Sequence, residues 1–227
     1  FQTSFRINKR GKNPMKITII NGSPKHGEST SALMIKYISS QIREGGNNEI
    51  NIYNVNKGFL SKTQQKEISE SDALVFAYPL YVDSIPAHLL NILIDIDNKK
   101  LLKKNTMIYC IVNNGFFEGQ QSHIAVQQLK NWCNSCGVKW GQAIGTGAGE
   151  MFRFTSHIPL GHGPNKNFGH AINCLAENIL NQKSGDDLLI SPNYSRTVWK
   201  IQGTYFFWYK LAMKNGVKWK DLRKRLD

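Results

Sequence analysis

The fold is decided by residues 16–30, which read KITIINGSPKHGEST. The first five residues are a mostly β-branched run typical of a short strand, and the run stops at Asn21-Gly22-Ser23-Pro24, a dense turn signal. Apolar residues then recur at helical spacing. They are Leu33, Met34, Tyr37, Ile38 and Ile42. The stretch therefore predicts a strand, a turn and a helix that begins near Ser29.

The alternation of strand and helix continues along the chain. Further strands are predicted at residues 49–55, 74–77, 106–112 and 138–144, and further helices after Pro86, at 122–136 and at 166–180. Such an alternation is typical of an α/β fold with a doubly wound parallel sheet. Ligands of these sheets bind outside the carboxyl ends of the strands, at the point where the strand order reverses. The loops after the first, third and fourth strands are therefore the candidate site.

Composition excludes several classes of protein. The 227 residues are 41% hydrophobic and 20% charged, which excludes a disordered or low-complexity chain. Uninterrupted apolar stretches are too short to span a membrane. Four cysteines are too few for a disulfide scaffold, and no signal peptide is recognisable, so we expect a cytoplasmic protein.

The net charge of +13 is concentrated at the two ends. Residues 1–14 hold four cations and no anion, and residues 194–227 hold nine cations and two anions. The stretch between them carries only +2, whereas a nucleic-acid footprint would spread basic residues over the folded body. We therefore expect no nucleic-acid partner, and we expect residues 1–14 to be an N-terminal extension outside the fold.

The loop after the first strand, residues 22–30, favours an anion. It offers backbone N–H groups, a helix N-terminus and the hydroxyls of Ser23, Ser29 and Thr30. It lacks the Gly-Lys-Ser/Thr ending of a P-loop and the G-x-G-x-x-G spacing of a dinucleotide fold, so a terminal monophosphate fits it better. The plainer alternative is a serine or threonine that only caps the helix.

Two further loops would complete a ligand site. Residues 78–86 (YPLYVDSIP) carry aromatic and apolar side chains in a loop, and residues 113–119 (NNGFFEG) offer a glycine, two amides and two aromatics. Taken singly, these loops are explained by a buried tyrosine and an Asn-Gly turn. Taken together, the three loops describe a phosphate seat followed by two walls for a planar heteroaromatic ring.

Residues 17–25, 78–86 and 114–119 resemble the three cofactor loops of the flavodoxin-like NAD(P)H-dependent FMN reductases. The resemblance covers about residues 15–183. It implies a five-stranded sheet in the order 2-1-3-4-5, FMN at the carboxyl ends of the strands, and a homodimer. Residues 184–227 would then form a C-terminal arm that is aromatic and basic.

The resemblance also implies a role for individual residues. Ser23, Lys25, Ser29 and Thr30 would bind the FMN phosphate. Pro79, Leu80, Tyr81 and Val82, together with Asn113, Asn114, Gly115 and Phe116, would hold the isoalloxazine ring. Many members of the family have arginine where this chain has Lys25, which weakens an argument from bidentate phosphate pairing.

The reaction implied is transfer of hydride from NAD(P)H through the flavin to a quinone, nitro-aromatic, azo or flavin acceptor. The flavin supplies the chemistry, so we assign no catalytic side chain and no metal, and place Tyr81, Phe116 and His123 near the substrate face. One alternative is a flavodoxin-type protein that only carries electrons between partners. Another is a surface-binding protein that has kept the fold and lost the flavin.

Two other features have competing interpretations. Cys133 and Cys136 have the spacing of a redox dithiol, but they end a late helix, which favours buried core cysteines. The last 34 residues hold 8 of the 24 aromatic residues, interleaved with lysines. Such an arm would lie on a membrane surface or pack on the partner subunit or over the flavin mouth, and the consecutive aromatics at 205–209 favour packing.

Overall fold

The computed structural model describes residues 14–222 and 224. The extension expected at residues 1–14 therefore lies outside the described residues except for Pro14, which is exposed. The chain divides into two compact units, Phe1–Pro192 and Asn193–Asp227. We call them the sheet unit and the C-terminal unit and describe each by itself.

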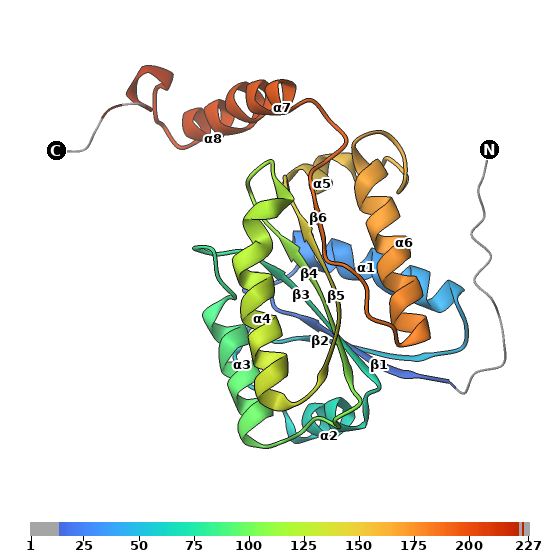
Figure 1. The fold of residues 1–227 in the computed structure, drawn as a ribbon. Coiled ribbons are helices and arrows are strands. Elements are labelled where there is room, and N and C mark those ends of the chain that lie inside the picture. Colours follow the sequence, from blue (N-terminus) through green and yellow to red (C-terminus); the bar gives the residue numbers. More distant parts are fainter. Residues whose placement is uncertain (1–13, 223, 225–227) are drawn as a thin grey trace. The chain divides into compact units, whose positions relative to one another are not determined.

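A parallel sheet of six strands forms the centre of the sheet unit (Figure 1). The strands are β1 (Lys16–Asn21), β2 (Glu49–Asn54), β3 (Ala73–Pro79), β4 (Met107–Asn113), β5 (Lys139–Thr146) and β6 (Leu188–Ile190). Their order is β2-β1-β3-β4-β5-β6, and every neighbouring pair is parallel. The five predicted strands and their order are confirmed, but the expectation of a five-stranded sheet is wrong.

The sixth strand pairs with the end of β5. Leu188, Leu189 and Ile190 lie opposite residues 144–146. Just before β6, the carboxylate of Asp187 accepts hydrogen bonds from the backbone N–H of Ala143 and from the indole N–H of Trp140, at 3.0 and 3.1 Å. Residues 184–192 therefore belong to the sheet unit, and the separate C-terminal unit begins at Asn193 rather than at residue 184.

Helices cover both faces of the sheet. Helices α1 (Thr30–Glu44) and α6 (Lys166–Asn181) pack on one face, and α3 (Ala87–Asn98) and α4 (His123–Cys136) on the other (Figure 1). Strand β3 contributes alternately to the two cores, Val75 to the first and Phe76 to the second, and both side chains are fully buried. Burial on both faces explains why this strand is a continuous apolar run.

Two short helices complete the sheet unit. Helix α2 (Lys62–Glu70) buries only Ile68 and begins with a reciprocal pair of hydrogen bonds between Ser61 and Gln64, a capping box. Helix α5 (Met151–Thr155) follows the glycine-rich end of β5. Residues 149 and 150, which precede α5, reach the site described below.

The C-terminal unit is one helical run followed by a turn. Helix α7 (Arg196–Gln202) continues through a π-helical stretch (Gly203–Trp208) into α8 (Tyr209–Lys214), and Trp219–Asp221 form a short 3₁₀ turn. The side chain of Ser195 caps α7, and the rings of Tyr209 and Trp219 meet edge to face with centroids 5.3 Å apart. Among the described residues, no helix is both long and apolar enough to cross a membrane.

Candidate functional site

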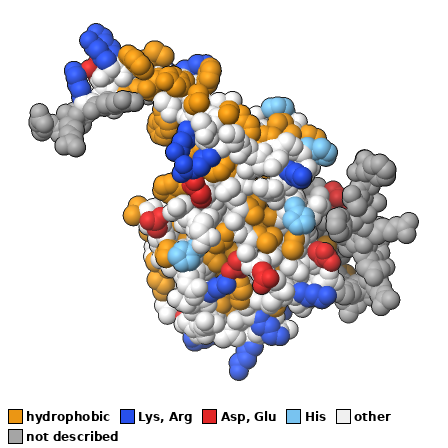
Figure 2. Space-filling view, turned by 45° about the horizontal axis from the view of Figure 1, so that its top comes forward, with side chains coloured by type: hydrophobic (Ala, Val, Ile, Leu, Met, Phe, Trp, Pro, Cys, Tyr) orange, Lys and Arg blue, Asp and Glu red, His pale blue; other side chains and the backbone are white. Residues whose placement is uncertain are grey.

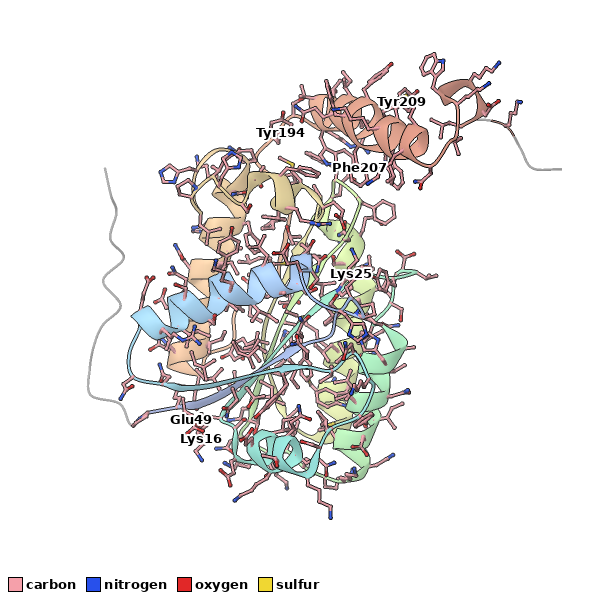
Figure 3. The ribbon with its side chains drawn as sticks, turned by 180° about the vertical axis from the view of Figure 1, so that it is seen from behind. Lys16, Lys25, Glu49, Tyr194, Phe207 and Tyr209 are labelled. Atoms are coloured by element: carbon pink, nitrogen blue, oxygen red, sulfur yellow. The ribbon has the colours of Figure 1, made fainter. Side chains whose placement is uncertain are left out.

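A cavity of about 250 Å³ opens at the carboxyl ends of β1, β3, β4 and β5. Its lining residues are Ser23, Lys25, Ser29, Thr30, Ser31, Pro79, Leu80, Tyr81, Asn113, Asn114, Gly115, Gly149 and Glu150. Figure 3 shows Lys25 at this end of the sheet, with Lys16 and Glu49 at the other. The cavity brings together ten of the twelve residues expected to bind a cofactor. The other two, Val82 and Phe116, are exposed beside it and do not line it.

The N-terminus of α1 forms one wall of the cavity. The Ser29 hydroxyl caps the helix by accepting a hydrogen bond from the N–H of Ala32 at 3.1 Å. The N–H groups of Thr30 and Ser31 begin the helix, where no preceding turn supplies carbonyl partners. This wall therefore presents hydrogen-bond donors and the positive end of the helix dipole.

The side chain of Asn21 stabilises the loop before α1 by a hydrogen bond to its backbone. The carboxamide oxygen of Asn21 accepts a hydrogen bond from the N–H of Ser23 at 3.1 Å, and the Ser23 hydroxyl accepts one from the N–H of Lys25 at 3.3 Å. Ser23 is buried. Because the hydroxyls of Ser23 and Ser29 act as acceptors here, each keeps its proton to donate to a ligand.

The loop after β5 also lines the cavity and is bonded to the start of α1. The Gly149 carbonyl accepts a hydrogen bond from the Thr30 hydroxyl at 3.3 Å, and its N–H donates to the Asn114 carbonyl at 2.7 Å. A Cβ at residue 149 would lie 3.0 Å from that carbonyl oxygen, so glycine permits the close approach. The sequence reasoning missed Ser31, Gly149 and Glu150. The glycine-rich run at residues 145–149 is the signal that would have indicated Gly149 and its neighbour Glu150. This run follows the fifth predicted strand, whose carboxyl end lies at the same edge of the sheet as the cavity.

Lys25 is the cation of the cavity, and it has an acidic neighbour. Its ammonium lies 3.7 Å from the carboxylate of Glu150, which also lies 3.6 Å from the guanidinium of Arg153. The side chains of Lys25 and Glu150 are both about half exposed (51% and 48%). A pair this open to water is weak, so Lys25 can exchange Glu150 for an anionic ligand at small cost.

The two asparagines at the end of β4 organise the loops. The amide nitrogen of Asn113 donates to the Ser31 hydroxyl at 2.9 Å and to the Tyr78 carbonyl at 3.2 Å, which ties β4 to α1 and β3. The Asn114 amide donates to the Ser122 hydroxyl at 2.9 Å and accepts from the N–H of Phe116 at 2.9 Å. The Asn114 side chain is therefore engaged within its own loop.

The loop after β3 ends in a tight hairpin. Tyr81 and Ser84 exchange backbone hydrogen bonds, and the two residues between them, Val82 and Asp83, have φ angles of 49° and 54°. A β-branched residue rarely adopts such an angle, so the turn stores strain at Val82. This turn directs Val82 into solvent, where it is 97% exposed, and leaves Leu80 and Tyr81 on the cavity.

His88 contacts the loop between β1 and α1 without lining the cavity. The Nε2 atom of His88 lies 3.1 Å from the Gly22 carbonyl oxygen. Partial burial lowers the pKa of His88 below its ordinary value of 6.5. His123, expected near the substrate face, lies at the start of α4 and does not line the cavity.

The two cysteines at the end of α4 are poorly suited to redox chemistry. Burial raises the pKa of Cys136 to about 12 and shifts the pKa of Cys133 in the same direction. The reactive form of a cysteine is the thiolate, which both shifts suppress. The structure thus supports a packing role, with Cys133 in the core beneath α4.

The comparisons with known proteins agree with this architecture. A family model described as "flavodoxin-like fold" matches residues 15–151, more than half of the chain. The chain belongs to this flavodoxin-like family. The match runs from β1 to the first residue of α5, so all four strand ends that line the cavity fall within the part typical of the family. No protein with curated annotation matches the chain.

Three solved structures share the fold. An NADH:FMN oxidoreductase (EMOB) in apo form is 17% identical with a TM-score of 0.56, covering 75% of this chain and 91% of that chain. An NAD(P)H:quinone oxidoreductase from Methanothermobacter marburgensis is 15% identical with a TM-score of 0.53, covering 73% and 96%. A short-chain flavodoxin associated with a bacterial microcompartment is 9% identical with a TM-score of 0.51, covering 75% and 99%. At these identities the likeness concerns the fold.

Proposed function

We propose that this flavodoxin-like protein is an FMN-dependent NAD(P)H oxidoreductase that reduces a quinone, nitro-aromatic, azo or flavin acceptor. One observation carries the proposal: a single cavity unites the anion-binding start of α1 with the apolar loop after β3 and the glycine turn after β4. The cavity lies where parallel α/β sheets bind their ligands, at the carboxyl ends of the strands on either side of the reversal in strand order.

The residues of the cavity fit FMN. Ser23 and Ser29 offer hydroxyl protons, Thr30 and Ser31 offer the first N–H groups of α1, and Lys25 offers a positive charge, which together suit a terminal phosphate. The Thr30 hydroxyl already donates to the Gly149 carbonyl, so its backbone N–H is the better phosphate donor. When bound, FMN would supply the hydride chemistry that no side chain of the cavity offers.

The remaining lining residues would position the flavin ring. Pro79, Leu80 and Tyr81 form an apolar wall, and Gly115 has no atom within 4 Å of where a Cβ would be, so its backbone is open to a ligand. Val82 and Phe116 are outside this wall and would contact only what lies beyond the cofactor. Both belong to the proposal as residues near the substrate rather than as cavity walls.

The names of two structural neighbours, an NADH:FMN oxidoreductase and an NAD(P)H:quinone oxidoreductase, agree with the proposed reaction class. The third neighbour, a flavodoxin, agrees with the alternative, a protein that only carries electrons between partners. Two further expectations complete the proposal. The resemblance implies a homodimer, which sedimentation would test. The cysteine content implies a cytoplasmic location, which cell fractionation would test.

The first experiment is a visible absorption spectrum of the purified protein, with identification of any released flavin, followed by anaerobic addition of NADH or NADPH. An FMN band that disappears on addition supports the oxidoreductase. A flavin that neither nicotinamide reduces supports the electron carrier. A protein that stays colourless after addition of FMN contradicts both functions.

A matched pair of cap variants tests the phosphate seat. Ser29→Ala removes both the cap of α1 and a proposed phosphate donor, whereas Ser61→Ala removes a cap of α2 that does not line the cavity. Each change should cost about 1 kcal/mol of stability. We expect Ser29→Ala to weaken FMN binding at least tenfold and Ser61→Ala to leave it unchanged. Equal FMN affinity in the two variants would remove Ser29 from the phosphate seat.

A further inference from the structure

The C-terminal unit has no core of its own. Among its described residues, 193–222 and 224, none is buried. Phe206, Trp208 and Trp219 are 65%, 62% and 61% exposed. The large aliphatic side chains of Ile201, Leu211 and Met213 are exposed as well. Surfaces of this kind are typical of a site that binds another surface.

The same unit is strongly basic. Six cations precede its first acidic residue, Asp221. They are Arg196, Lys200, Lys210, Lys214, Lys218 and Lys220. Asp221 is itself paired with Lys224 at 2.8 Å, so it does not offset the six. Figure 2 shows blue cationic side chains beside the orange apolar ones on this unit.

The helical run from Arg196 to Lys214 combines both properties on one element. Figure 3 labels Phe207 and Tyr209 on it, one from the π-helical stretch and one from α8. Tryptophan and tyrosine prefer the boundary between lipid and water, and lysines can extend from an apolar helix to anionic headgroups. A basic helix that also carries tryptophan, phenylalanine and leucine suits binding in the plane of a membrane surface, and no described helix suits crossing one.

We propose that the C-terminal unit binds the surface of an anionic lipid membrane. A second copy of this unit fits poorly as a partner, because pairing two copies would bring like charges together. The proposal therefore departs from the packing on a partner subunit expected from the sequence. A single-stranded nucleic acid would pair with the cations and stack on the rings, but it would leave the aliphatic side chains of Ile201, Leu211 and Met213 in water.

The charge half of the proposal is tested with the full chain and two kinds of vesicle, phosphatidylcholine alone and phosphatidylcholine mixed with phosphatidylglycerol. The protein should float with the mixed vesicles only, and added salt should weaken binding. The triple variant Lys200→Gln, Lys210→Gln, Lys214→Gln should lower the partition coefficient about fivefold per charge. The matched control, Lys57→Gln, Lys66→Gln, Lys104→Gln, removes three exposed cations from the sheet unit and should bind as the unchanged protein does.

The aromatic half is tested with Phe206→Ser, Trp208→Ser. This variant keeps every charge and should bind mixed vesicles at least tenfold more weakly, with a smaller blue shift of tryptophan fluorescence. Far-UV circular dichroism of the full chain checks that the variants keep the helix content of the unchanged protein.

Three results would overturn the proposal. They are equal loss of binding in the control triple variant, a dimer that becomes a monomer in the aromatic variant without vesicles, and tighter binding to poly(U) than to mixed vesicles. None of these readouts depends on a flavin.

Discussion

Phe76 and Phe206 show that the same side chain is buried in one unit and exposed in the other. In the sheet unit, Phe76 lies on the central strand β3, is fully buried and meets the ring of Trp132 edge to face at 5.9 Å. In the C-terminal unit, Phe206 is 65% exposed on a single helical run. An apolar residue joins a core only where the chain brings an opposing surface to it, and a sheet covered on both faces does so whereas one helix cannot.

The largest expected effect comes from truncating these two phenylalanines and comparing the losses in free energy of unfolding. Phe76→Ala should lower the free energy of unfolding by about 3–5 kcal/mol, because it leaves a cavity between β3 and α4. Phe206→Ala should change it by less than about 0.5 kcal/mol. Urea unfolding of both variants measures the difference. Similar losses would mean that Phe206 is buried in the folded protein in solution.

Two glycines give effects of opposite sign. A Cβ at Gly119 would lie 2.1 Å from the Ile190 carbonyl oxygen and 2.4 Å from that of Gly145, so Gly119→Ala should displace β6 and cost about 1–3 kcal/mol. Gly203 is helical and a Cβ there meets nothing within 4 Å, so Gly203→Ala should stabilise its helix by up to about 1 kcal/mol. Thermal unfolding and far-UV circular dichroism measure the two changes. A harmless Gly119→Ala would contradict the six-stranded sheet.

His88 gives a smaller, pH-dependent effect. Because burial lowers its pKa in the folded protein, folding favours the neutral ring, and this contribution is complete above the unfolded value of about 6.5. It is lost as the pH falls from there toward the folded pKa. The ring is partly exposed, so the loss should be about 0.5 kcal/mol or less after screening.

His88→Gln removes this titration while glutamine can still donate to the Gly22 carbonyl. The unchanged protein should therefore lose more stability than the variant between about pH 7.5 and pH 5.5, as measured by urea unfolding at each pH. The C-terminal unit contains no histidine, so a chain that ends at Pro192 should show the same difference. Identical pH profiles for the protein and the variant would show that the ring is fully solvated.

The smallest expected effect concerns the boundary between the units. A chain that ends at Pro192 should unfold with a free energy within about 0.5 kcal/mol of the full chain, because none of residues 193–222 and 224 is buried. It should lose vesicle binding while keeping FMN. A large loss of stability would show that the C-terminal unit packs on the sheet unit.

Much of the sheet could be predicted because its strands carry strong local signals. Strands β3 and β4 are continuous apolar runs, and β1 ends at a dense turn. Strand β6 has only three residues, and its position depends on Asp187 and on the space left by Gly119, both features of the folded chain. Helix α2 was not predicted, because it buries only one apolar side chain and so has no apolar periodicity. The spacing of Ser61 and Gln64, which form its capping box, was the one local signal for it.

The candidate site was predictable as a set of loops, whereas the roles of its members were not. Ser29 could be proposed from residue type and position alone, whereas Lys25 could be proposed only from the resemblance to the FMN reductases. That Asn114 binds its own loop, or that Glu150 lies beside Lys25, depends on how the loops of β4 and β5 approach each other. Val82, expected to hold the flavin ring, does not line the cavity, because it lies in a left-handed turn that a β-branched residue rarely adopts and that its sequence did not predict.

The hydrogen bond between Thr30 and Gly149 determines when the cavity can form during synthesis of the chain. The bond joins residues 119 positions apart. A growing chain that already contains the loop at residues 22–30 therefore still lacks the Gly149 carbonyl to which Thr30 donates. At about 5–20 residues per second, translation supplies that carbonyl roughly 6–24 seconds later. Any cofactor that needs this hydrogen bond in place can therefore bind only after residue 149 has been synthesised.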